Sequence, residues 1–257
     1  MSKYLKFFYI ILIILFLYTP VIILILFSFN SSNYIVQWHG FTLKWYKEIF
    51  NGSRLNIYLF NSIKLSIYSI FISVILAFPL ALFINFQSKY YKKFLYFFLY
   101  LQIIIPEIIM GISLAIFFSI IKVTLSLTTM LYAHVTFCIG FFTLSFISRV
   151  DENLWLYYLA GLDLGLSKII AIIKILMPIT ISPFIASVFF VLAISLDNFV
   201  ISFFTSGLGS TTIPIVLFSS IRHGIDPILN AEITLIFLIV LLLLSLSISL
   251  TKIKKGN

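Results

Sequence analysis

The sequence predicts an all-α protein that crosses a membrane several times. Of its 257 residues, 62% are hydrophobic and only 10% are charged, whereas an average soluble domain carries about 25% charged residues. The apolar residues form runs of roughly 20 residues or more, the length that a helix needs to cross a hydrocarbon layer. These runs lack the alternating polarity of a membrane barrel, so helices must satisfy their backbone hydrogen bonds. Run length therefore favours a membrane bundle over one large soluble core.

Six apolar runs are candidates for transmembrane helices. They cover residues 7–29, 61–86, 94–121, 125–147, 179–205 and 229–250. We expect them to form one transmembrane domain over residues 1–257. The first run is longer than the roughly 7 to 15 apolar residues of a secretory signal, and no small-x-small cleavage site follows it. It is therefore interpreted as an uncleaved first span.

The formal net charge of +9 is explained by where the basic residues stand. With the N-terminus in the cytoplasm, eleven of the 17 Lys and Arg residues fall on the cytoplasmic side and six on the other. The bias towards positive cytoplasmic loops then predicts that both termini are cytoplasmic. Because the basic residues mark the ends of the runs and do not gather on one surface, the expected partner is membrane lipid and not nucleic acid.

The sequence lacks the motifs of an energy-converting or metal enzyme. No Gly is followed by Lys, so the phosphate-binding loop of an ATPase is missing, and no Gly-x-Ser-x-Gly elbow is present. Cys138 is the only cysteine and lies within an apolar run, which excludes a disulfide within the chain and a cysteine metal cluster. His39, His134 and His223 are too far apart for a local zinc motif, and ordinary polar or interfacial roles are predicted for them. We expect no enzymatic activity, no cofactor and no metal.

Residues 148–178 form the only long connection on the predicted cytoplasmic side. Its apolar residues recur at spacings of three and four, which is typical of amphipathic helices; they are Leu154, Tyr158, Leu162, Ile169, Ile172, Ile173 and Leu176. The pattern predicts a helix from about Glu152, a bend at Gly165 and a second helix that ends at Pro178. Periodicity alone leaves two alternatives open, a docking site for a partner and a plain pair of interfacial helices.

This loop resembles the coupling loop of the permeases of ATP-binding-cassette importers, in which EAA, three residues and Gly precede a hydrophobic run that ends in Pro. The residues to which the resemblance assigns contact with an ATPase are Ala160, Gly161, Asp163, Gly165 and Pro178. The chain departs from the pattern at Leu159, which stands where the family carries its acidic residue.

Four further segments resemble the polyamine branch of the same family. They are LKWY at 43–46, PEIIMGISL at 106–114, AHVTFC at 133–138 and SLDNFVISFFTSG at 195–207. The resemblance implies a type I importer permease (MetI-like) fold in the bacterial cytoplasmic membrane. It also implies the partners: a second permease of the PotB type, two copies of an ATPase of the PotA type, and an extracytoplasmic polyamine-binding protein of the PotD type. ATP hydrolysis would be supplied by the ATPase.

Polar residues inside the apolar runs are the candidates for a solute pathway. Glu107 lies in the third run, where a carboxylate that faced lipid would cost about 3 kcal/mol. We expect it to face the bundle interior, or else to pair with a Lys or sit at a helix junction. In the fifth run one stripe at helical spacing has Asp197 beside it; its members are Ser195, Asn198, Ser202 and Thr205. The stripe could bond neighbouring helices or line a wet surface that accepts cations.

A flexible polyamine needs separated acceptors and apolar walls for its methylene groups. Glu107 and Asp197 offer carboxylates, and Ser195 and Asn198 offer further polar groups, although the resemblance puts a second acid at Asn198. Trp45 could supply an aromatic wall or belong to the interfacial aromatic belt. The sequence thus predicts an importer permease for polyamines. The alternatives are an importer permease for another small solute, and an autonomous channel or membrane enzyme.

Overall fold

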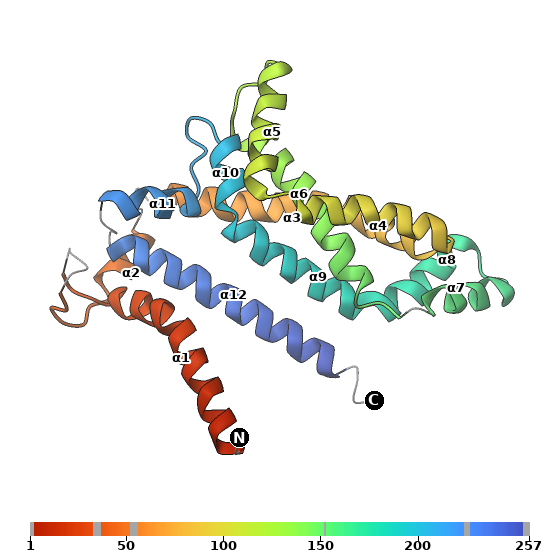
Figure 1. The fold of residues 1–257 in the computed structure, drawn as a ribbon, viewed down its shortest axis with the longest axis horizontal. Coiled ribbons are helices and arrows are strands. Elements are labelled where there is room, and N and C mark those ends of the chain that lie inside the picture. The colour runs from red at the N-terminus through yellow and green to blue at the C-terminus, as the bar shows by residue number, and fades with distance from the viewer. Residues whose placement is uncertain (1–2, 33–36, 52–55, 152, 224–226, 254–257) are drawn as a thin grey trace. The chain divides into compact units, whose positions relative to one another are not determined.

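The protein is built from helices. The computed structural model describes residues 3–32, 37–51, 56–151, 153–223 and 227–253 (Figure 1). Within these residues the extended structure amounts to an isolated bridge between Asn30 and Phe41. The chain divides into two compact units, residues 1–59 with 216–239 and residues 60–215 with 240–257. The predicted all-α fold class is confirmed, and each unit is described on its own below.

The first unit has a small core around a buried tryptophan. Its helices are α1 (Lys3–Phe27), α2 (Lys44–Phe50) and parts of α3 (Asn56–Asn85), α11 (Ile213–His223) and α12 (Pro227–Ile253). Trp45 is only 4% exposed, packs with Ile49 and Ala231, and donates its indole hydrogen to the Asn30 carbonyl oxygen at 2.6 Å. The predicted roles of Trp45 as a pathway wall or a belt residue are therefore wrong, because both need an exposed ring.

The second unit holds most of the transmembrane helices. Besides most of α3 it contains α4 (Lys89–Ile104), α5 (Glu107–Ile120), α6 (Leu127–Ile147), α7 (Leu154–Asp163), α8 (Lys168–Ala171), the π-turn η1 (Ile172–Leu176), α9 (Met177–Asp197) and α10 (Phe199–Thr205). Helix α6 forms the centre, and its Phe137, Phe142 and Phe146 have almost no exposed surface. It packs against α4, α9 and α10. Polar side chains on the neighbouring helices that face this buried helix therefore need hydrogen-bond partners on it.

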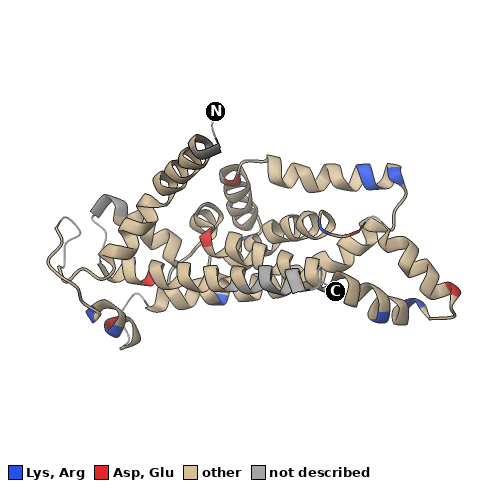
Figure 2. Cartoon of the chain, turned by 90° about the horizontal axis from the view of Figure 1, so that it is seen from below, with Lys and Arg blue, Asp and Glu red and all other residues tan. Residues whose placement is uncertain are grey.

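Four helices are long and apolar enough to cross a membrane. They are Phe7–Phe27, Asn56–Asn85, Leu127–Ile147 and Lys168–Asp197. The pair α4 and α5 makes a fifth if it crosses once, and α12 contributes a shorter apolar stretch, Pro227–Leu242. Figure 2 shows the basic residues mostly near helix ends, as the charge pattern predicts. All six predicted runs fall on helices, while the number of crossings and their orientation stay predictions.

The third predicted span is broken, which corrects the expected single helix over 94–121. Helices α4 and α5 meet at an angle of 95° (Figure 1). Ile105 and Pro106 between them have ψ angles of 124° and 134°, which are extended values. Proline has no N–H to donate and disfavours the helical conformation of the residue before it. Glu107 is therefore the first residue of α5 and does not lie in the middle of a straight span.

The fifth predicted span, residues 179–205, also differs from the observed helices, both where it begins and where it ends. The second helix of the 148–178 loop does not end at Pro178 but runs into α9, so that one helix extends from Lys168 to Asp197. In the π-turn before Pro178 the Met177 N–H bonds to the Ile172 carbonyl oxygen, five residues back. That wider turn accommodates a proline, which has no hydrogen to donate. The helix stops instead at Asn198, and the predicted range 179–205 is divided there.

Candidate functional site

The two predicted carboxylates each lie beside the break of a helix. Asp197 is the last residue of α9 and Glu107 is the first of α5, and both side chains are exposed. Helix α10, which follows Asp197, packs along α5. Gly111 of α5 permits this approach, because a Cβ atom there would come within 3.0 Å of the Phe204 ring on α10. Glu107 and Asp197 therefore lie next to the breaks of helices whose neighbouring parts pack together.

Neither carboxylate forms an ion pair with a Lys or Arg within the described part of the chain. Of the alternatives for Glu107, pairing with a Lys is therefore not observed, whereas its place at a helix junction is. Two neighbouring negative charges repel each other, and a bound cation relieves that repulsion. The arrangement suits a solute that carries more than one positive charge.

The polar stripe of the fifth run lies on a different, buried surface. Ser195, Asn198, Ser202 and Thr205 are each at most 5% exposed. The Asn198 Oδ1 atom accepts a hydrogen bond from the Ile201 N–H at 2.9 Å, so this residue caps α10. Ser195 bonds the Ser69 hydroxyl of α3 at 3.1 Å. The stripe bonds neighbouring helices, which was one of the two alternatives, and the wet surface predicted along it is not found.

His134 of α6 lies at this joint, although the sequence predicted only an ordinary polar or interfacial role for it. Its ring is 1% exposed. Nδ1 lies 3.0 Å from the Ser195 hydroxyl on α9, and Nε2 lies 2.8 Å from the Ser202 hydroxyl on α10. The available signal was a histidine inside an apolar run together with a polar stripe on another run, because buried polar groups in a bundle need partners. His134 therefore joins the two sides of the break that follows Asp197.

Five polar residues gather beside the joint. They are Ser62 of α3, Ser195, Asn198 and Ser202 around the break, and Thr212 of the segment after α10. The Thr212 hydroxyl is buried without a hydrogen-bond partner. The joint thus retains hydrogen-bonding capacity that its own side chains do not use.

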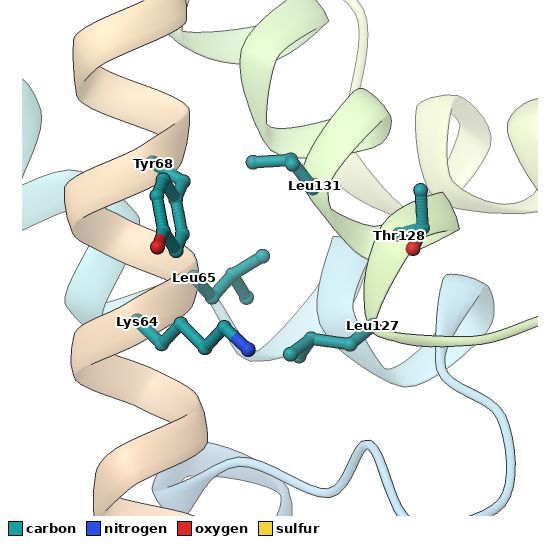
Figure 3. Close-up of a pocket in the computed structure, with 6 residues that line it drawn as sticks. All are labelled: Lys64, Leu65, Tyr68, Leu127, Thr128 and Leu131. Atoms are coloured by element: carbon teal, nitrogen blue, oxygen red, sulfur yellow. The ribbon is translucent and has the colours of Figure 1, made fainter.

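A groove of about 300 Å³ between α3 and α6 has the opposite charge (Figure 3). Lys64 and Tyr68 of α3 face Leu127 and Leu131 of α6, and the Lys64 ammonium group extends towards Leu127. A fixed ammonium group repels a cationic solute. The carboxylate pair, and not this groove, is therefore the candidate site for a cation.

The 148–178 loop is held at its base and exposed at its tip. Phe86, just after α3, packs against two rings of α7: Trp155 is tilted by 50° with its centroid 5.0 Å away, and Tyr158 is stacked with its centroid 5.2 Å away. Gly165 has a φ of +86°, which confirms the predicted bend. At the tip Leu164 is 84% exposed and at the start of the next helix Ile169 is 71% exposed. The loop offers an apolar tip on a firmly anchored base.

The five residues assigned to coupling are not equally accessible. Ala160, Asp163 and Gly165 are exposed, and Pro178 is exposed in the first turn of α9. Gly161 is buried, and a Cβ atom there would lie 2.3 Å from the end of the Ile175 side chain. Gly161 thus permits α7 to pack on the π-turn, while the other four lie on the surface.

Comparison with known proteins finds similarity to transport permeases. No family model matches it. It is 28% identical to the spermidine/putrescine transport system permease protein PotC of Haemophilus influenzae, over 92% of both chains, and 28% identical to PotC of Escherichia coli, over 94% of this chain and 92% of that one. It is 29% identical to the putrescine transport system permease protein PotI of Escherichia coli, over 86% of this chain and 81% of the relative.

A solved structure of the MetNI methionine ABC transporter in an inward-facing conformation contains a chain with the same fold. The TM-score is 0.61 at 14% sequence identity, over 77% of this chain and 94% of that one. The chain has the fold of an ABC transporter permease. In this permease fold the carboxylate pair occupies the ends of two interrupted helices. Transporters use interrupted helices to place polar groups on a cavity, because irregular backbone is tolerated at membrane depth only there or inside protein.

Proposed function

We propose that the chain is the permease subunit of an ATP-driven importer and forms part of the pathway for a polyamine, such as spermidine or putrescine, across the cytoplasmic membrane. The similarity to permeases named for these solutes, over most of their length, supports the proposal. The observation that carries it is the exposed pair of Glu107 and Asp197, two carboxylates that lie beside the breaks of two helices and lack a cationic partner in the described chain.

The chemistry of the pair fits a transported polyamine. Spaced ammonium groups exchange between carboxylates, and each carboxylate compensates a charge that would otherwise be costly inside a membrane. Binding at this pair must be weak, because a pathway that held its solute tightly would not release it. Most of the affinity then belongs to an extracytoplasmic binding protein of the PotD type.

The proposed complex contains a second permease of the PotB type and two copies of an ATPase of the PotA type. The sequence has no phosphate-binding loop, so ATP hydrolysis has to come from another chain. The exposed tip around Leu164 and Ile169 is the surface proposed to dock on the ATPase. Leu159 replaces the acidic residue of the family loop, so this docking relies on apolar contact. In the proposed complex the loop that docks on the ATPase lies on the cytoplasmic side, and so do both termini.

Uptake of labelled spermidine tests the pair directly. Loss of one hydrogen bond between charged groups, about 1.5–3 kcal/mol, should lower the uptake rate at limiting spermidine by about tenfold or more in Asp197→Asn and in Glu107→Gln. Glu48→Gln is the matched control, since it removes a carboxylate from α2 in the first unit. Protein levels in the membrane must be equal. Unimpaired uptake by both variants would remove the pair from the mechanism.

A second candidate keeps the importer and changes its cargo. Asn198 stands where the resemblance puts a second acid, which lowers the negative charge beside Asp197 and favours a solute of lower charge. Reconstitution with the candidate partners, followed by a ligand screen for stimulated ATP hydrolysis, separates the two. Stimulation by spermidine or putrescine supports the first candidate, and stimulation by another small solute alone supports the second.

A further inference from the structure

We propose that His134 is a positioning residue, which clamps the break between α9 and α10 and so fixes where the Asp197 carboxylate lies relative to Glu107. This inference concerns how the carboxylate pair is built. Its consequence for transport rests on the proposed function, whereas its consequence for geometry does not.

The clamp acts on both sides of Asp197. Ser195 precedes it by two residues in α9 and bonds the His134 Nδ1 atom at 3.0 Å. Asn198 follows it directly, and its carbonyl oxygen accepts the Ser202 hydroxyl at 2.6 Å. That same hydroxyl oxygen lies 2.8 Å from the His134 Nε2 atom. One imidazole ring therefore links the helix that ends at Asp197 to the helix that begins after it.

Counting hydrogens assigns the protonation of the ring. Ser202 has a single hydroxyl hydrogen, which it gives to the Asn198 carbonyl, so its oxygen accepts from Nε2–H of His134. The ring is buried with no ion pair in the described chain, and an unpaired buried cation is costly. The ring is thus neutral, which leaves Nδ1 as an acceptor 3.0 Å from the Ser195 hydroxyl. That hydroxyl also has the Ser66 hydroxyl of α3 as an acceptor at 3.3 Å. The Ser69 hydroxyl donates to the Ser66 carbonyl oxygen at 3.0 Å, and its oxygen lies 3.1 Å from the Ser195 hydroxyl.

Both carboxylates depend on this clamp. Asp197 is exposed, but its neighbours Ser195 and Asn198 are 3% and 5% exposed, so the backbone on each side is fixed in the interior. Glu107 is carried by α5, which packs on α10. A change in the angle between α9 and α10 would therefore move Asp197 and α5 relative to each other. Placement errors of about 1 Å can cost as much as 100-fold in a site that depends on geometry.

Spin labelling measures this placement without any assumption about the solute. Cysteines introduced as Glu107→Cys and Asp197→Cys in the full-length chain, in membranes, would carry nitroxide labels; Cys138 is the only native cysteine and is buried, so it stays unlabelled. We expect dipolar broadening of the spectrum with native His134 and its loss in His134→Leu. His134→Gln should retain it, because an amide can donate to Ser202 and accept from Ser195.

Two further variants keep the test decisive. Ser73→Ala removes another buried hydrogen bond between α3 and α6, from the Ser73 hydroxyl to the Val135 carbonyl, without touching the break, and should leave the broadening unchanged. If His134→Leu does not accumulate in the membrane, Ser202→Ala removes the α10 side of the clamp alone and should also reduce the broadening. Unchanged broadening in His134→Leu, or in Ser202→Ala where His134→Leu does not accumulate, would overturn the proposal.

A double-mutant cycle tests the consequence for transport. His134→Leu should raise the KM for spermidine uptake by about tenfold in the native background and by less than about twofold in the Asp197→Asn background, since residues that act through one another are not additive. An equal increase in both backgrounds indicates a general loss of structure and contradicts the positioning role. If the native complex does not take up polyamines, the proposed function fails, and the spin-label result still decides the role of His134.

Discussion

The two ends of α9 differ in a way that the positions of prolines would not predict. At its first end the helix continues past Pro178, and it also contains Pro183. At its second end there is no proline, yet the helix stops between Asp197 and Asn198. The helix is thus unbroken where the sequence suggests a break and broken where it suggests continuity.

Hydrogen bonding explains the difference. Before Pro178 the π-turn moves the backbone bond to a carbonyl five residues back, so the helix loses little when a donor is missing. At Asn198 the backbone leaves the helix with a ψ of 96°, and side chains replace the lost bonds: Asn198 caps α10, and Ser195 and Ser202 bond to His134. The first end adapts within its own turn, whereas the second needs a partner on α6. A break that is bonded to a partner on α6 can hold a carboxylate in a fixed place. The turn before Pro178 adapts only within itself and has no such support.

The largest expected effect on stability comes from a residue just after α10, beyond the broken end of α9. Gly207 follows α10 and lies so close to the segment before α6 that a Cβ atom would be 1.8 Å from the Leu125 carbonyl oxygen, which is backbone and cannot move aside cheaply. Gly207→Ala should destabilise the fold by about 3 kcal/mol or more, the upper range for overpacking. The measurement is the amount of monodisperse protein after detergent extraction, by fluorescence-detected size-exclusion chromatography.

Two controls delimit that prediction. Ser206→Ala alters a neighbouring side chain that bonds only its own helix, through the Phe203 carbonyl, and should stay within about 0.5 kcal/mol of the native protein. Gly165→Ala, in the 148–178 loop, meets no atom within 4 Å but has a φ of +86°, so it should cost about 1 kcal/mol. Equal losses for Gly207→Ala and Gly165→Ala would show that the backbone contact between Gly207 and Leu125 is not decisive.

The cap of α10 comes next in size. Asn198→Ala removes the acceptor for the Ile201 N–H and should cost about 1 kcal/mol, with a range of 0.5–2 kcal/mol for helix caps. Asn198→Ser keeps a capping oxygen and should recover most of that loss. Thermal unfolding of the purified chain, followed by circular dichroism, provides the comparison. Identical midpoints for the alanine and serine variants would contradict the capping role.

Much of this architecture could be predicted from the sequence. All six apolar runs fall on helices, the bend at Gly165 is present, and Pro106 lies at the break between α4 and α5. These features are local, because each depends on residues within a turn or two. The surface shared by Glu107 and Asp197 was expected only as a common pathway, since the two residues are ninety positions apart.

The failures share a cause in tertiary contacts. The break at Asn198 depends on His134, which lies in a different helix about sixty residues earlier. Helical spacing therefore gave the correct stripe, with Ser195 in it, and bonding between helices was one of its two alternatives, but the stripe was assigned to one continuous helix. The prediction for Trp45 was wrong for a similar reason, because its burial depends on Ala231, a residue from the other end of the chain. Neither contact leaves a periodic signal in the sequence.

The smallest expected effect is at the unbroken end. Pro178→Ala restores an N–H donor in the first turn of α9, and because the π-turn already accommodates the proline, stability should change by less than about 1 kcal/mol. The same unfolding measurement checks this value against Asn198→Ala. A Pro178→Ala variant that unfolds far more easily than Asn198→Ala would mean that the proline itself holds the 148–178 loop in place. The first end of α9 would then depend on a specific residue as much as the second, and the contrast between a self-adapted turn and a clamped break would no longer hold.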